Sequence, residues 1–184
     1  MKQLAIALAL TGSCVFATTI AVTPASALET YEAQMEASDA ASQARIDMTD
    51  AFGPKELKPG QYVWRDVPDS AGPERIIISL SDQMAYVYRG DTLMAATTIS
   101  SGRDSKPTPS GIFSVLNKMP FYRSKKYDNA AMPFAQFFEP HGIALHAGFV
   151  GGEPNSHGCV HLPMSFAKKL YSITDVGTPV IIGA

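Results

Sequence analysis

The chain has 184 residues, of which 46% are hydrophobic and 17% are charged, and its formal net charge is −2. Apolar content at this level with a charge near zero argues against a disordered chain, and the lack of a basic excess argues against a nucleic-acid-binding protein. A chain of this length buries enough surface to fold without disulfides or a metal ion. We therefore expect one globular domain and no nucleic-acid partner.

The first 27 residues have the three parts of a secretory signal peptide. Lys2 precedes an apolar run over residues 4–22, and Ala25-Ser26-Ala27 supplies the small residues of a cleavage site. An uncleaved membrane anchor is the alternative, but Thr, Ser and Gly residues dilute the run. We expect cleavage after Ala27 and a protein exported to the periplasm or the cell wall.

Cleavage would leave Cys159 as the single cysteine of an exported protein, because Cys14 lies in the predicted leader. Thiols in exported proteins are normally paired in disulfides. An odd cysteine in such a protein indicates a reactive thiol rather than a structural one.

The elements expected along the rest of the chain are mostly strands. Residues 28–72 are rich in Ala and Glu and predict a weakly helical or disordered spacer, with a short strand at 62–64. Alternating and β-branched runs predict further strands, and one apolar stripe predicts a short helix. The predicted strands are 75–80 and 83–89, paired as a hairpin, then 92–100, 112–116, 142–146 and 178–182, and the predicted helix is 164–171. We expect a mainly β domain over residues 73–184, with one or two short helices.

A long connection is expected over residues 118–139, where basic and aromatic side chains are mixed. Arg123, Lys125 and Lys126 lie within it. Long loops in compact domains are often lids or binding elements, but a solvated basic edge fits the same pattern. Both interpretations remain open on the sequence alone.

All four histidines fall with Cys159 within residues 141–161. A thiol needs a neighbouring base to become a nucleophile near neutral pH, and histidine is suited to that role. The same histidine can protonate a leaving amine, so a Cys/His pair suffices for acyl transfer. Gly158 lets the backbone approach a substrate carbonyl, and amides around Gly158 and Cys159 are candidate donors to an oxyanion.

Zinc binding is the competing chemistry for this cluster. In an extended segment, His157, Cys159 and His161 would share one face, with His146 as a fourth ligand. Gly158 and the turn residues before it argue against a regular strand there. The spacing favours a catalytic thiol but leaves zinc open.

Four motifs in the same order resemble one known family. Ser156-His157-Gly158-Cys159-Val160, preceded by Ile143-Ala144-Leu145-His146-Ala147-Gly148, closely resembles the active-site signature of the L,D-transpeptidase (YkuD) catalytic domain. Thr108-Pro109-Ser110-Gly111 leading into Ile112-Phe113, and Met132-Pro133-Phe134, look like the same family. The resemblance extends over residues 75–184.

The resemblance implies a β-sandwich enzyme that remodels peptidoglycan without a cofactor or metal. Cys159 would attack a tetrapeptide stem, expel D-alanine and form a thioester, which an amine of a second stem (a 3→3 cross-link) or of an envelope protein resolves. Water as acceptor would give L,D-carboxypeptidase side activity. His146 would be the general base and acid, oriented by the carbonyl of Ala147, while Ser156, His157 and Gly158 shape the pocket and oxyanion site. Inhibition by carbapenems is also implied.

The sequence departs from the family pattern two residues after the cysteine. Many members carry arginine there, where it would hold a substrate carboxylate, whereas this chain has His161. Histidine is a weaker and pH-dependent partner for a carboxylate. We expect His161, Arg123 and Lys125 to contact substrate. A zinc-dependent peptidase and a catalytically idle wall-binding domain are the alternative functions.

Overall fold

The structure, a computed structural model, describes residues 28–184. The predicted signal peptide, residues 1–27, lies outside the described residues. Within the described part, no helix is both long enough and apolar enough to cross a membrane.

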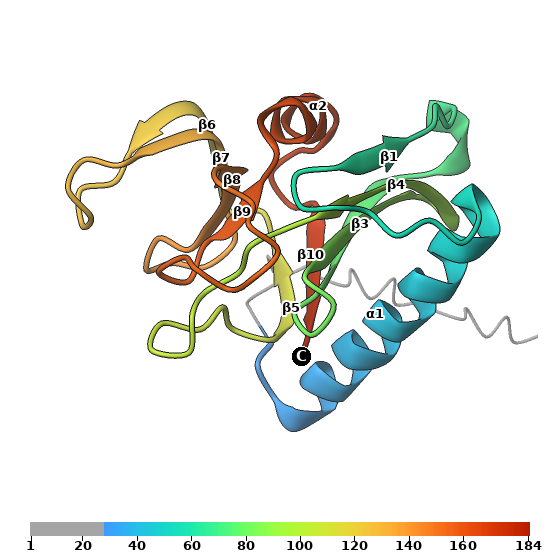
Figure 1. The fold of residues 1–184 in the computed structure, drawn as a ribbon, viewed down its shortest axis with the longest axis horizontal. Helices are drawn as coiled ribbons and strands as arrows, with labels where there is room; N and C mark the ends of the chain where they lie inside the picture. The colour runs from blue at the N-terminus through green and yellow to red at the C-terminus, as the bar shows by residue number, and fades with distance from the viewer. Residues whose placement is uncertain (1–27) are drawn as a thin grey trace, which may run out of the picture.

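Two sheets and two helices make up the fold, which confirms the mainly β prediction (Figure 1). The six-stranded sheet contains, in spatial order, β1 (Tyr62–Trp64), β4 (Thr92–Thr98), β3 (Met84–Arg89), β2 (Glu74–Ser79), β10 (Pro179–Gly183) and β5 (Gly111–Ser114). The four-stranded sheet contains β6 (Asn117–Arg123), β7 (Ala131–Phe137), β8 (Ala144–Ala147) and β9 (Val160–Leu162). The helices are α1 (Tyr31–Phe52), α2 (Met164–Ile173) and a 3-10 turn at Asp69–Ala71. Neighbouring strands are antiparallel except for the pairs β2–β10 and β8–β9.

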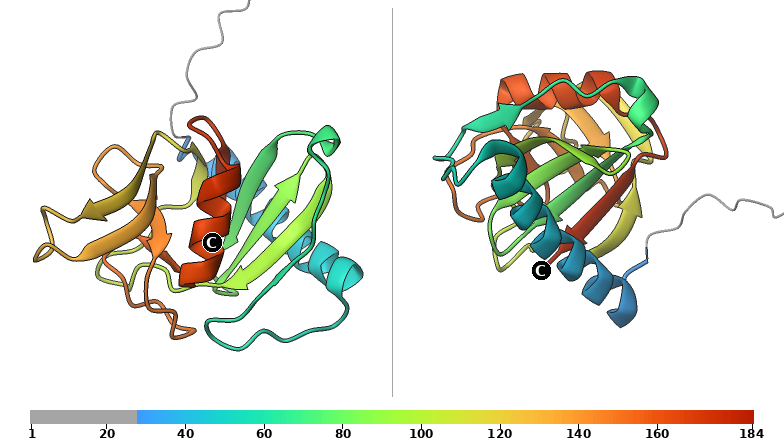
Figure 2. Two further views of the ribbon diagram at one scale, coloured as in Figure 1. Left: turned by 90° about the horizontal axis from the view of Figure 1, so that it is seen from above. Right: turned by 90° about the vertical axis from the view of Figure 1, so that its right-hand side faces the viewer.

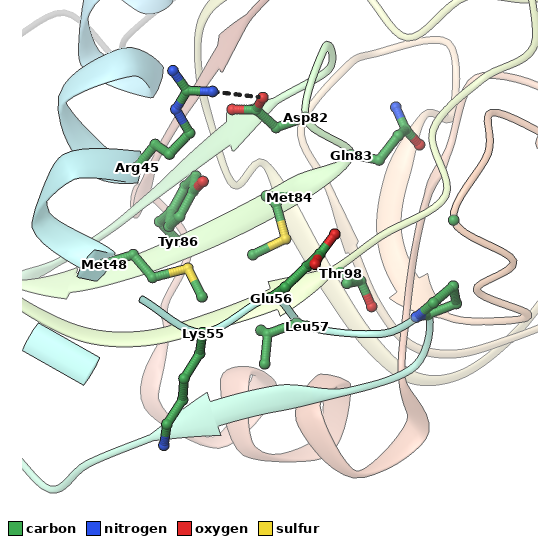
Figure 3. Close-up of a pocket in the computed structure, with 12 residues that line it drawn as sticks. Arg45, Met48, Lys55, Glu56, Leu57, Asp82, Gln83, Met84, Tyr86 and Thr98 are labelled. Atoms are coloured by element: carbon green, nitrogen blue, oxygen red, sulfur yellow. Dashed lines mark ion pairs between the residues drawn. The ribbon is translucent and has the colours of Figure 1, made fainter. Parts of the chain in front are cut away.

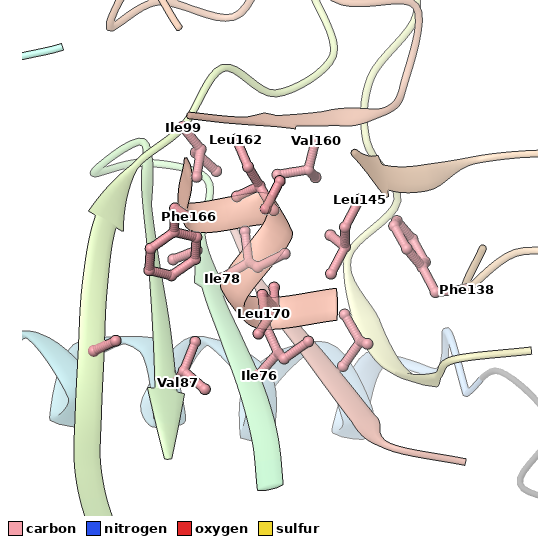
Figure 4. Packing of buried hydrophobic residues seen from close by; sticks show 14 of the residues in the cluster. Ile76, Ile78, Val87, Ile99, Phe138, Leu145, Val160, Leu162, Phe166 and Leu170 are labelled. Carbon is pink, nitrogen blue, oxygen red and sulfur yellow. The ribbon is translucent and has the colours of Figure 1, made fainter. Parts of the chain in front are cut away.

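The six-stranded sheet is apolar on both faces. Along β2, Ile76 and Ile78 face the main core, whereas Ile77 between them belongs to a second cluster on the opposite face. Successive side chains of a strand point to opposite faces, so this run serves two cores. The main core also takes residues of the smaller sheet and of α2, among them Leu145 and Phe166 (Figure 4).

Helix α1 covers the outer apolar face of the six-stranded sheet, which Figure 2 shows from two sides. Within the segment 28–72, expected to be a weakly helical or disordered spacer, residues 31–52 form α1, a helix of 22 residues. Its buried side is a stripe of alanines at helical spacing, completed by Met48. Alanine gives little hydrophobic signal in a sequence but allows close packing, as at Gly183, where an added Cβ would lie 2.6 Å from the Ala37 carbonyl oxygen.

The segment 118–139 is a β-hairpin rather than the long connection that the sequence suggested. Strands β6 and β7 pair from Asn117 with Phe137 to Arg123 with Ala131. The hairpin projects from the rest of the fold (Figure 1), so the side chains of β6 are mostly exposed and show no buried alternation. The other predicted strands and the helix at 164–171 are confirmed, with ends that differ by at most two residues.

Candidate active site

The predicted site lies at two parallel strands of the smaller sheet. β8 carries His146, and β9 begins immediately after Cys159. In the register of the two strands His146 is opposite His161. Pairing of these strands therefore brings together a thiol and two imidazoles from two neighbouring segments of the chain.

His146 is buried, with 6% of its surface exposed, and its ring is oriented by one backbone carbonyl. Nδ1 lies 2.9 Å from the carbonyl oxygen of Ala147. A carbonyl only accepts hydrogen bonds, so Nδ1 carries the proton and Nε2 presents a lone pair. Burial, and secondarily the charge of His161, lower the pKa of His146 to about 4, whereas the Ala147 bond opposes the shift. The ring is neutral at pH 7 and is able to accept a proton.

Cys159 is partly buried at the end of the turn that precedes β9. Its thiol is oriented toward the carbonyl of Gly142, with 4.0 Å between sulfur and oxygen. Burial raises the pKa of the Cys159 thiol, and a hydrogen bond from the Ala144 backbone opposes that increase. The resting thiol is therefore protonated near pH 7 and needs a base to become nucleophilic.

Ser156 fixes the turn that carries the cysteine. Its hydroxyl accepts a hydrogen bond from the Gly158 amide at 3.0 Å and donates to the carbonyl of Cys159 at 2.5 Å. Gly158 has φ of 110°, a conformation that side chains other than glycine rarely adopt. The Gly158 amide, which the sequence suggested as an oxyanion donor, is thus already bonded within the turn.

Thr108 holds the same turn from a second loop. Its hydroxyl accepts from the Gly102 amide at 2.9 Å and donates to the Gly158 carbonyl at 2.8 Å. Next to it, the carbonyl of Ser101 accepts the amides of Asn155 and Ser156. The sequence placed Thr108 in a family motif but gave it no role, because a contact between residues 50 positions apart is not visible in local spacing.

The tip of the β6–β7 hairpin closes over the cysteine. Tyr127 stacks on His157, with ring centroids 4.4 Å apart and an interplanar angle of 27°. Lys125 lines a cavity beside Cys159. Arg123, by contrast, donates to the Asn129 carbonyl at 3.1 Å and so braces the hairpin turn itself.

Two cavities meet at Cys159. One, of about 120 Å³, has a basic wall that includes Lys125, Lys126 and His141. The other, of about 290 Å³, is lined by His146, His161 and the exposed Phe149 among others. Cys159, His157 and Tyr127 line both cavities. The thiol therefore lines both cavities.

His161 lies against His146 rather than standing free. The two ring centroids are 4.9 Å apart, and the planes meet at 67°. Nδ1 of His161 lies 3.2 Å from the carbonyl oxygen of Phe149. Its polar edge is thus partly used within the protein, unlike that of a side chain placed only to bind a carboxylate.

The described residues, 28–184, contain no group of three or more His, Cys, Asp or Glu side chains placed to hold a metal ion. The zinc alternative therefore has no set of ligands in this part of the chain. A separate cavity of about 470 Å³ lies between α1 and the six-stranded sheet, where Arg45 pairs with Asp82 at 3.6 Å (Figure 3). Cys159 and His146 are not among its lining residues.

Comparison with solved structures finds similar folds in L,D-transpeptidases. An L,D-transpeptidase from Mycobacterium smegmatis is 21% identical, with a TM-score of 0.57 over 60% of this chain and 58% of that chain. L,D-transpeptidase 3 from Mycobacterium tuberculosis, in complex with a faropenem-derived adduct, is 22% identical, with a TM-score of 0.56 over 61% of this chain and 60% of that chain. An L,D-transpeptidase from Stackebrandtia nassauensis is 24% identical, with a TM-score of 0.57 over 77% of this chain and 67% of that chain. The chain thus covers about three-fifths of the first two structures.

A search of curated protein sequences found no match. The model of the L,D-transpeptidase catalytic domain family, YkuD, matches residues 73–182, which is more than half of the chain. These residues include the cysteine turn, the β8–β9 pair and the hairpin described above. The chain belongs to the L,D-transpeptidase catalytic domain (YkuD) family.

Proposed function

We propose that the chain is an exported L,D-transpeptidase that forms a thioester between Cys159 and a peptidoglycan stem peptide and transfers the acyl group to an amine. The observation that carries this proposal is the placement of Cys159 and a buried, neutral His146 on the wall of one cavity. Family membership supports the transpeptidase class. Export to the periplasm or cell wall would follow cleavage of residues 1–27.

The first half-reaction follows from the protonation states. Nε2 of His146 takes the thiol proton as the sulfur of Cys159 bonds to the carbonyl carbon of the stem peptide. When the tetrahedral intermediate collapses, the peptide C–N bond breaks and His146 returns the proton to the leaving D-alanine nitrogen. The carbonyl of Ala147 keeps His146 in the required tautomer throughout.

The oxyanion of the tetrahedral intermediate needs hydrogen-bond donors near the sulfur. Because Ser156 already accepts the bond from the Gly158 amide, we assign the backbone amide of Cys159 as the donor from this turn. Ser156, Gly158 and Thr108 then act by holding the turn in shape. His157 acts through its stack with Tyr127, which fixes the hairpin over the site.

The second half-reaction reverses the roles of the same groups. His146 takes a proton from the acceptor amine as the amine attacks the thioester, and then protonates the departing Cys159 sulfur. An amine of a second stem would give a 3→3 cross-link, an amine of an envelope protein would attach that protein, and water would give carboxypeptidase activity. Lys125 and Lys126 offer positive charge to carboxylates of a stem peptide in the cavity of about 120 Å³.

A β-lactam tests the first half-reaction directly, because its strained amide is an acyl donor for a nucleophilic thiol. One neighbour carries a faropenem-derived adduct, and another, LdtMt1, is in complex with imipenem. We expect imipenem to form a covalent adduct with this protein, detected by intact-protein mass spectrometry. Cys159→Ala should form none, His146→Gln should react at least about 100-fold more slowly, and a chelator should change nothing.

The acceptor is tested with a tetrapeptide stem and a second stem as amine, by following D-alanine release and cross-linked product. A Cys159 adduct without D-alanine release would restrict the proposal to acylation. No adduct with retained binding to purified peptidoglycan would indicate the idle wall-binding domain, and chelator-sensitive hydrolysis would indicate a zinc peptidase. The N-terminal sequence of the secreted protein, expected to start at Leu28, tests export.

A further inference from the structure

His161 and His146 form a pair of rings across two parallel strands. The register β8–β9 sets the two residues opposite each other, and the ring planes meet edge to face with centroids 4.9 Å apart. Side chains at opposed positions lie on the same face of a sheet, so the backbone pairing enforces this contact.

The surroundings of His161 leave its ring little freedom. A Cβ added at Gly148 would lie 2.8 Å from Cγ of His161, so the imidazole packs directly on the Gly148 backbone. Nδ1 lies 3.2 Å from the Phe149 carbonyl oxygen, and therefore carries the proton when the ring is neutral. In both histidines of the pair, Nδ1 thus donates to a backbone carbonyl, and Nε2 carries an unprotonated lone pair.

Two imidazoles in ring contact do not both become cations readily. A charge on one ring raises the free energy of a charge on the other, and at this separation inside a protein the repulsion shifts the second pKa by about one unit or more. The pair therefore takes up a single proton over the pH range in which isolated histidines would take up two.

We propose that His161 is a positioning residue that holds the His146 ring in place when neutral and, when protonated, withdraws His146 from proton transfer with Cys159. This inference rests on the proposed thioester chemistry. General-base catalysis turns His146 into an imidazolium, and a cation at position 161 would make that imidazolium form beside a like charge. The loss of activity at low pH then follows the protonation of His161.

Other titratable groups line the cavities beside the two histidines. His157 and Cys159 come from the turn before β9, and Tyr127 comes from the hairpin; all three line the same cavity. Lys125 and Lys126 line the cavity on the other side of Cys159. Burial and the charge of His157 lower the pKa of His161, and burial and the charge of His161 lower the pKa of His146.

The test compares the wild type with His161→Asn in the full-length protein. Asparagine keeps an N–H group near the position of Nδ1 and does not titrate, so it retains the bond to Phe149. With 13C-labelled histidine, NMR titration is expected to show the pKa of His146 rising by about one unit in this variant. His141→Asn is the matched control, because His141 is exposed and its partner is Glu139, and it should leave the pKa of His146 unchanged.

The second readout is the rate of imipenem acylation from pH 4.5 to 8. We expect His161→Asn to lower the plateau rate, because the His146 ring loses its support, and to move the acid limb of the rate to lower pH. An unmoved pKa of His146, or an acid limb that stays in place, would overturn the pairing. A carboxylate-binding role would instead raise KM for a stem peptide at every pH. Absence of any adduct in the wild type would refute the proposed function, while the NMR result would still decide the pairing.

Discussion

Thr108 offers a sharp test of how the site is held together, because one hydroxyl joins two loops. Its Oγ1 lies between the Gly102 amide and the Gly158 carbonyl, and the residue is 5% exposed. Thr108→Val keeps the shape of the side chain but removes both hydrogen bonds. The substitution leaves one buried donor and one buried acceptor without partners.

The expected cost follows from those two groups. A buried polar group left unpaired costs about 1–3 kcal/mol, and partial relaxation toward water favours the lower half of that range. We expect Thr108→Val to lower the free energy of unfolding by about 2–4 kcal/mol in total, which for a domain of this size lowers Tm by about 5–15 °C. The Gly158 carbonyl also loses its anchor, and displacement of the adjacent Cys159 should slow acylation by about 10-fold or more.

Thermal unfolding followed by circular dichroism, together with imipenem acylation well below Tm, measures both effects. Thr108→Ser is the control, since it keeps the hydroxyl and removes only a methyl group; its acylation rate should stay near that of the wild type. A Tm for Thr108→Val within about 2 °C of the wild type, with unchanged acylation, would show that this hydroxyl does not hold the cysteine turn.

Three other predictions concern stability and access. Burial lowers the pKa of His146 from 6.5 to about 4, so between these pH values the unfolded chain binds a proton that the folded chain does not. The free energy of unfolding should therefore fall by roughly 3 kcal/mol as the pH drops through this window. Denaturant titrations at pH 7 and 4 should show this loss reduced in His146→Gln; equal losses would contradict it. Ala44→Glu on the buried side of α1 should cost about 3 kcal/mol or more, whereas Ile46→Glu on the exposed side should change Tm little. Tyr127→Ala removes the stack on His157 and should raise KM for a stem peptide more than it lowers kcat; a kcat effect alone would count against a role of the hairpin in binding.

Local sequence was sufficient for the second helix and for the strands other than β6, β7 and β9, and it singled out the residues of the proposed chemistry. Ile76, Ile77 and Ile78 form a β-branched run that predicts a strand wherever it lies. Cys159 and the four histidines within 21 residues predicted a thiol site, and the family motifs singled out His146. Such signals depend on residue type and short spacing, and both are properties of the chain before it folds.

Tertiary structure decided the features that depend on distant partners. The alanine stripe of α1 is buried because the six-stranded sheet has a second apolar face on which the helix packs. In the hairpin over 117–137, β7 pairs with β8 and is largely buried or half-buried, whereas the side chains of β6 are mostly exposed. Pairing of β8 with β9 sets the His161 ring directly against the His146 ring. These contacts join different elements of the chain, so the periodicity within one element does not predict them. The packing of two sheets and a helix fixes them together.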